Sequence, residues 1–149
     1  MASVGIDERS PSKKAAETAR WAVTMTKVRI RRVLSRTRWQ LVTFCGKAGY
    51  ESAGIVDLLA VRKDHGKPKV KEMKRGDALQ IVLIQVKGGG AAMPKPEDCE
   101  RLSAVAKQLK ARHVLLATWK KGSAAQFYSY EPRKTRKWIP VSDLDAVFK

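Results

Sequence analysis

The chain has 149 residues and a mass of 16.6 kDa, a length that fits one domain with a sizeable core, since 44% of its residues are hydrophobic. Lysine and arginine number 31 against 14 acids, so the formal net charge is +17. Such an excess favours a polyanionic partner, and nucleic acid is the first to consider because each neutralised phosphate releases a condensed counterion. No apolar run approaches the length of a membrane-spanning helix, so we expect no membrane partner.

Two cysteines, Cys45 and Cys99, are too few and too far apart for a zinc site or a disulfide framework. A reducing compartment follows, and an N-terminus without an apolar signal core agrees with a cytoplasmic protein. A transit peptide stays open because residues 20–38 are basic. Residues 1–12 are polar and aperiodic, so we expect a disordered arm there and a single domain over residues 13–149.

Apolar residues recur at helical spacing from about residue 14 to 35 and predict a helix with one buried face. Its other face is basic in the second half, where the helix dipole favours cations. That face is either a solvated surface or a ridge that follows a phosphate backbone. The run at residues 39–45 predicts the first strand.

Two apolar stretches, residues 54–61 and 81–90, predict buried strands. Both contain polar residues, Asp57 in the first and Gln85 with Lys87 in the second. Strand side chains alternate, so Gln85 and Lys87 share one face and lie roughly 7 Å apart. An unpaired buried charge is costly, so Asp57 and Lys87 form either a functional site or a buried ion pair between neighbouring strands.

Asp57 is followed some tens of residues later by Gln85-Val86-Lys87. This pattern resembles the signature of the PD-(D/E)XK nuclease superfamily, which has an aspartate and then acid-X-lysine on the next strand. The form that it resembles most is the small archaeal Holliday-junction-resolvase type. Two residues depart from the pattern: Val56 replaces a loosely kept proline, and Gln85 replaces the acid.

The order of the expected elements is also similar to that superfamily, over roughly residues 14–131. A glycine-rich exit is followed by a helix at residues 96–110 and by strands at residues 113–119 and 125–130. The resemblance implies an α/β fold with a restriction-endonuclease-like core, a mixed central β-sheet flanked by helices in the order α-β-β-β-α-β-β. A closing helix is expected at residues 141–148, with Ser142 as its N-cap.

The resemblance implies a metal-dependent endonuclease that hydrolyses DNA phosphodiester bonds, and its resolvase form extends this to branched or structured DNA. Asp57 would bind Mg²⁺ or Mn²⁺ directly, Gln85 would offer a neutral amide oxygen, and the Val86 carbonyl would complete the protein ligands. Magnesium prefers oxygen ligands and keeps several waters, so a sparse site suffices. No small-molecule cofactor is expected.

By the same resemblance, Lys87 would orient or help deprotonate the attacking water. The negative charge that Gln85 lacks would come from Glu51, in a polar loop, or from Glu17 on the first helix. An exposed surface acid remains the alternative for Glu51. Resolvase-type members form two-fold dimers that place two sites on two strands, and a homodimer is left open here because no segment indicates a dimer face.

Other segments are open to two interpretations. Residues 62–77 predict a charged hairpin tip, which either grips a nucleic-acid backbone or serves solubility alone. The run Gly88-Gly89-Gly90 permits close approach of the backbone to a ligand, or only a turn. The candidate contacts to nucleic acid are Lys27, Arg31, Arg32, Arg36, Arg38, Lys47, Gly88, Gly89 and Lys95.

Two alternatives to a nuclease remain. A nucleic-acid-binding protein on the same fold, without catalysis, would bind in a salt-sensitive way and show no turnover; the neutral Gln85 supports it. A basic RNA-associated protein would bind RNA independently of Asp57, but the chain lacks the Arg/Lys-Gly-aromatic motif of common RNA-recognition modules.

Overall fold

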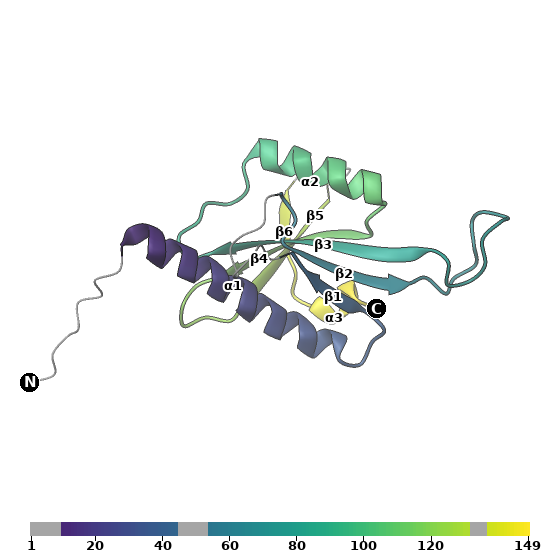
Figure 1. Cartoon of the computed structure of the whole chain (residues 1–149), viewed down its shortest axis with the longest axis horizontal. Coiled ribbons are helices and arrows are strands. Elements are labelled where there is room, and N and C mark those ends of the chain that lie inside the picture. Colours follow the sequence, from purple (N-terminus) through teal and green to yellow (C-terminus); the bar gives the residue numbers. More distant parts are fainter. Residues whose placement is uncertain (1–9, 45–53, 132–136) are drawn as a thin grey trace, which may run out of the picture.

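The computed structural model describes residues 10–44, 54–131 and 137–149. Its described strands form one sheet in the order β1-β2-β3-β4-β5-β6, in which β3 and β4 are parallel and the other neighbours antiparallel. Helix α2 covers one face of the sheet, and α1 and α3 cover the other (Figure 1). The elements are α1 Pro11–Leu34, β1 Gln40–Thr43, β2 Leu58–Lys63, β3 Leu79–Gly88, α2 Pro96–Leu109, β4 His113–Trp119, β5 Gln126–Tyr130, β6 Trp138–Pro140 and α3 Leu144–Val147.

The predicted fold class is confirmed. The structure is an α/β fold with a mixed central sheet flanked by helices, and its elements run α-β-β-β-α-β-β before β6 and α3 are added. The parallel pair β3–β4 is joined through α2, as a parallel pair requires a crossover connection.

Hydrophobic residues pack on both faces of the sheet. The α1 side contains Ile30, Ile84 and Phe148, each no more than 1% exposed. The α2 side contains Leu83 and Leu102, both fully buried. Strand β3 is therefore apolar at successive positions because helices cover it on both faces.

Helix α1 begins earlier than its apolar periodicity predicts. Ser10 is the N-cap, and its hydroxyl oxygen accepts a hydrogen bond from the N–H of Lys13 (3.3 Å), while Pro11 occupies the first turn. The end of the predicted arm is thus a helix start, and residues 1–9 lie outside the described residues. The buried face runs from Ala22 to Leu34, whereas Ala15, which the pattern placed on it, is exposed.

The strand that carries Asp57 is shifted along the chain. It was predicted at residues 54–61, but β2 spans Leu58–Lys63, because residues 54–57 are bent and Gly54 has a φ of +118°. Arg62 therefore belongs to the sheet and not to the hairpin tip. Strand β1 is also shorter than predicted, at Gln40–Thr43.

The C-terminal segment differs from its prediction. Trp138–Pro140 forms β6, an edge strand where a proline is tolerated because its missing N–H faces away from the ladder. The N–H of Val141 donates to Phe127 O (2.9 Å), which extends that pairing and delays the helix. Helix α3 spans only Leu144–Val147, with Asp143 in place of Ser142 as its N-cap.

Candidate functional site

Asp57 lies immediately before β2 and is held from both sides. Its carbonyl oxygen accepts a hydrogen bond from the N–H of Phe44 (3.1 Å), just beyond β1, and its own N–H donates to Ile84 O in β3 (3.0 Å). The residue is half-buried. The backbone of Asp57 is thus positioned by two strands, which restricts where its carboxylate can point.

The carboxylate of Asp57 contacts the central residue of the predicted motif. Oδ2 accepts a hydrogen bond from the backbone N–H of Val86 at 2.7 Å. Hydrogen bonds to an ionised acceptor are short and roughly twice as strong as neutral ones. The structure therefore brings Asp57 against Gln85-Val86-Lys87, although 29 residues separate Asp57 from Val86 in the chain.

Gln85 is a buried polar residue on β3. Its side chain is 5% exposed, and among the described residues its Oε1 has no hydrogen-bond partner. Strand alternation puts Gln85 and Lys87 on the α2 side with Leu83, while Val86 packs on the α1 side. A buried acceptor without a partner destabilises the fold by about 1–3 kcal/mol. The Gln85 oxygen is therefore free to bind a cation or to accept a hydrogen bond from a ligand.

Lys87 is half-buried next to Gly88 at the end of β3. Within the described residues no salt bridge joins its ammonium group to Asp57. The alternative in which these two residues form a buried ion pair is therefore not the arrangement that the structure adopts.

Glu17 lies on α1 at the same end of β3. Its neighbour Thr18 packs against this end: a Cβ built on Gly88 would lie 3.2 Å from Thr18 O. Glu17 itself is half-buried. Two other predicted residues, Glu51 and Lys47, lie outside the described residues.

Gly88 and Gly89 have structural reasons for their identity. A Cβ built on Gly88 would lie 2.7 Å from Ala22 Cβ, so its missing side chain makes room for α1. Gly89 has a φ of +62°, in the left-handed region, and its N–H donates to Trp119 O (2.8 Å). The close approach at Gly88 is therefore to a helix, and the Gly89 N–H already has a partner in β4.

The donor set can be tested for its fit to a divalent cation. Among the described residues, no three histidine, cysteine, aspartate or glutamate side chains are grouped closely enough to hold a metal. Asp57 offers a carboxylate and Gln85 a buried amide oxygen without a partner. Oxygen ligands and a small number of protein groups are what magnesium accepts, since it retains several waters. The residues fit a sparse magnesium or manganese site.

The predicted cations lie mainly along the second half of α1 and the turn that follows it. Arg31, Arg32, Arg36 and Arg38 are exposed, and Lys27 is half-buried. Lys95 is the exposed N-cap residue of α2. Because Ala22 lies beside the end of β3 while Val33 packs near Phe148, α1 carries these cations away from Asp57 toward the opposite end of the sheet.

The sequence interpretation missed a cluster of cations at that opposite end. Arg62 and Arg112 both donate to the backbone oxygen of Lys149, at 2.6 and 3.0 Å. Burial, and then the neighbouring Arg112, lower the pKa of Arg62, while Asp64 raises it. The position of Arg62 after an apolar run was a signal that it belongs to the strand, but its contact with Lys149 spans 87 residues and has no local signature.

Comparisons with known proteins find likeness in structure and none in sequence. No protein-family model matches the sequence, and no curated protein matches it. Among solved structures, the chain is similar to Hjc, a Holliday junction resolvase from the archaeal hyperthermophile Archaeoglobus fulgidus. The two chains share 15% sequence identity, with a TM-score of 0.39, over 84% of this chain and 90% of the resolvase. No helix in the described ranges is long and apolar enough to cross a membrane.

Proposed function

We propose that the protein is a metal-dependent endonuclease that hydrolyses phosphodiester bonds in DNA, with branched DNA among its substrates. The observation that carries this proposal is the 2.7 Å hydrogen bond from the Val86 N–H to Asp57 Oδ2. It places a carboxylate against the segment that carries Gln85 and Lys87, at one end of the sheet.

In this proposal Asp57 and Gln85 hold a magnesium or manganese ion through their side-chain oxygens, and the carbonyl of Val86 is a third protein ligand. Glu17 and Glu51 are the candidates for the negative charge that Gln85 does not supply. The bound ion would act as a Lewis acid on the phosphoryl group. The two backbone hydrogen bonds of Asp57 hold its main chain in place and so restrict the position of its carboxylate.

Lys87 has a separate role in the proposal. It lies on the same face of β3 as Gln85, and its ammonium group has no ion-pair partner within the described residues. It would hold the attacking water in line with the scissile phosphate and offset the charge that develops on it.

Affinity for DNA is proposed to come from the basic surface. The cations on the second half of α1, with Lys47 and Lys95, would contact backbone phosphates, whereas Gly88 and Gly89 shape the end of β3. A homodimer would present two such sites to two strands of a branched substrate.

A second function, binding of nucleic acid without cleavage, is favoured by one observation. The side chain of Gln85 is neutral, and one oxygen of Asp57 already accepts a hydrogen bond from the backbone. Both features weaken a site for a divalent cation. On this alternative, binding of DNA would be salt-sensitive and would not depend on Asp57.

The test is cleavage of labelled linear duplex, single-stranded and four-way-junction DNA with magnesium or manganese. Wild-type protein is compared with Asp57→Asn and Lys87→Met. The matched controls are Asp143→Asn, whose side chain is exposed and makes no capping bond, and Lys107→Met on the exposed surface of α2. We expect cleavage to be lost in the first two variants and retained in the controls. Tight binding without cleavage under either metal would support the second function instead.

A further inference from the structure

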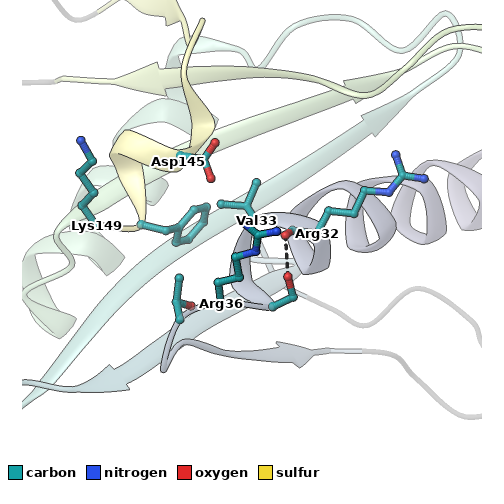
Figure 2. Close-up of a pocket in the computed structure, with 8 residues that line it drawn as sticks. Arg32, Val33, Arg36, Asp145 and Lys149 are labelled. Carbon is teal, nitrogen blue, oxygen red and sulfur yellow. Dashed lines mark hydrogen bonds between the residues drawn. The ribbon is translucent and has the colours of Figure 1, made fainter.

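A hollow of about 350 Å³ lies between the C-terminal end of α1 and helix α3, at the end of the sheet remote from Asp57 (Figure 2). Val33 and Phe148 form its apolar floor. Figure 2 shows Arg36 and Asp145 flanking the hollow, while Arg32 and Lys149 extend outward on opposite sides. Its lining residues are Arg32, Val33, Ser35, Arg36, Thr37, Asp145, Phe148 and Lys149.

The floor of the hollow is rigidly built. Phe148 is 1% exposed, and its ring packs edge-on against Trp39 with the ring centroids 5.6 Å apart. The indole Nε1–H of Trp39 donates to the carbonyl oxygen of Phe148 (2.8 Å). The apolar floor is therefore held by a buried aromatic pair and a buried hydrogen bond.

The backbone of Lys149, on the rim, is also fixed. Arg62 Nη2 and Arg112 Nη1 both donate to its oxygen. Arg62 is itself held, because its Nε donates to Gln80 Oε1 (2.6 Å) and its guanidinium lies 4.5 Å from the centroid of the Trp39 ring. The side chain of Lys149 thus starts from a fixed point beside the hollow.

The charges around the hollow favour an anion. The lining contains three cations, Arg32, Arg36 and Lys149, and one acid, Asp145, and within the described residues none of the three cations is in an ion pair. The lining is therefore positive and has no internal counterion bound to it.

A helix C-terminus ordinarily presents negative carbonyl ends, which would oppose an anion. At this end of α1 hydroxyl groups cap two of these carbonyls. Ser35 Oγ donates to Arg32 O (2.9 Å), and Thr37 Oγ1 donates to Leu34 O (2.9 Å). The capping leaves the arginines as the dominant electrostatic feature of the hollow.

We propose that this hollow binds one phosphate group of a nucleic-acid backbone and anchors the substrate away from the cleavage site. The inference rests on the proposed function only for the identity of the partner. Ala22, beside the end of β3, and Val33, in the hollow, are eleven residues apart on α1, or about 16 Å along the helix. A duplex that follows α1 and reaches both places must therefore span about five base pairs between them.

The first experiment titrates the whole protein with inorganic phosphate and follows binding by NMR. The Arg32→Gln/Arg36→Gln variant should bind phosphate about tenfold more weakly, the effect of losing a hydrogen bond to a charged group. The Asp145→Asn variant should bind more tightly than wild type, because a repelling charge is removed. Lys67→Gln/Lys69→Gln, which removes the same charge from the exposed hairpin, should leave phosphate binding unchanged.

Equal weakening in the hairpin variant would overturn the inference, because it would show a general charge effect and no defined site. Unchanged or weaker binding by Asp145→Asn would also overturn it. This measurement needs neither metal nor cleavage, so it tests phosphate binding in the hollow even if the protein does not cut DNA. If the protein cleaves DNA but its arginine variants bind phosphate like wild type, phosphate binding in the hollow is refuted and the proposed nuclease function is not.

The second experiment identifies the source of the phosphate. Binding of a 12-base-pair duplex is measured without metal at several salt concentrations, beside binding to vesicles that contain an anionic phospholipid. Loss of one backbone contact in Arg32→Gln/Arg36→Gln should reduce the slope of log affinity against log salt by about 0.9. A normal slope for the duplex, or an effect on vesicles alone, would overturn the assignment to nucleic acid.

Discussion

Gly88 in β3 lies so close to Ala22 in α1 that a Cβ atom built on the glycine would be 2.7 Å from the alanine Cβ. Thr18 O would lie 3.2 Å from the same atom. This contact fixes where α1 crosses the end of β3, next to Lys87. Gly88→Ala should therefore destabilise the protein by about 1–3 kcal/mol, the usual cost of overpacking. Chemical denaturation of the variant measures it.

The control for this prediction is a double-mutant cycle with Ala22→Gly. Glycine at position 22 costs about 1 kcal/mol in a helix interior, but it removes the clashing methyl group. The double variant should be more stable than the two single effects added together predict. Purely additive effects would show that the two residues are not in the contact described.

Thr26 is fully buried between α1 and the sheet, and among the described residues its hydroxyl has no hydrogen-bond partner. Thr26→Val removes that hydroxyl and keeps the shape of the side chain. We expect it to stabilise the protein by about 1 kcal/mol, since an unmatched buried polar group is lost. Thr26→Ala, which also leaves a cavity, should lack this gain. A Val variant less stable than wild type in thermal denaturation would show that the hydroxyl is bonded.

His113 at the start of β4 predicts a dependence of stability on pH. Burial, and then the neighbouring Arg112, lower the pKa of His113 below its ordinary value of 6.5, and Glu131 opposes the shift in part. The unfolded chain then binds the proton more readily than the folded chain. The contribution of His113 to stability should be complete above pH 6.5 and should be lost as the pH falls through the lower folded pKa.

Denaturation of wild type and His113→Gln, compared at pH 8 and pH 5, checks this prediction. The loss of stability on acidification should be smaller in the variant, because glutamine does not titrate. An equal loss in both proteins would assign the pH dependence to other groups.

Trp39 connects the core to Phe148, which lines the hollow beside α3. Its indole donates to Phe148 O in a buried hydrogen bond of 2.8 Å. Trp39→Phe leaves that carbonyl without its donor, so we expect a loss of about 1–3 kcal/mol in the free energy of unfolding. Val42→Ala, a change on the exposed edge of β1, is the comparison and should cost much less. Similar losses in the two variants would contradict a structural role for the bond.

The order of elements could be predicted because strands and helices carry local periodicity. The alternation that places Gln85 and Lys87 on one face is a property of β3 alone, and the burial of β3 on both faces explains why successive residues are apolar. The resemblance to a nuclease superfamily predicted that Asp57 lies close to β3. The structure shows this directly in the hydrogen bond from the Val86 N–H to Asp57.

The rest could not be predicted because it depends on contacts that are distant in sequence. Strand β6 has three residues and exists through its pairing with β5. The cation cluster depends on Arg62 and Arg112 meeting Lys149, which no local pattern encodes. The close approach of α1 to Gly88 is likewise a tertiary constraint without a local signature.

The most direct test of the proposed function restores the missing acid. Gln85→Glu puts a second carboxylate next in sequence to Val86, whose N–H contacts Asp57, at a position where the amide oxygen has no partner among the described residues. A charged oxygen ligand binds magnesium better than a neutral one. The measurement is the rate of magnesium-dependent cleavage of DNA by wild type, Gln85→Glu and Gln85→Glu/Asp57→Asn. The proposed function predicts faster cleavage by Gln85→Glu and none by the double variant. No gain from glutamate in a folded, DNA-binding protein, or cleavage that survives Asp57→Asn, would contradict it.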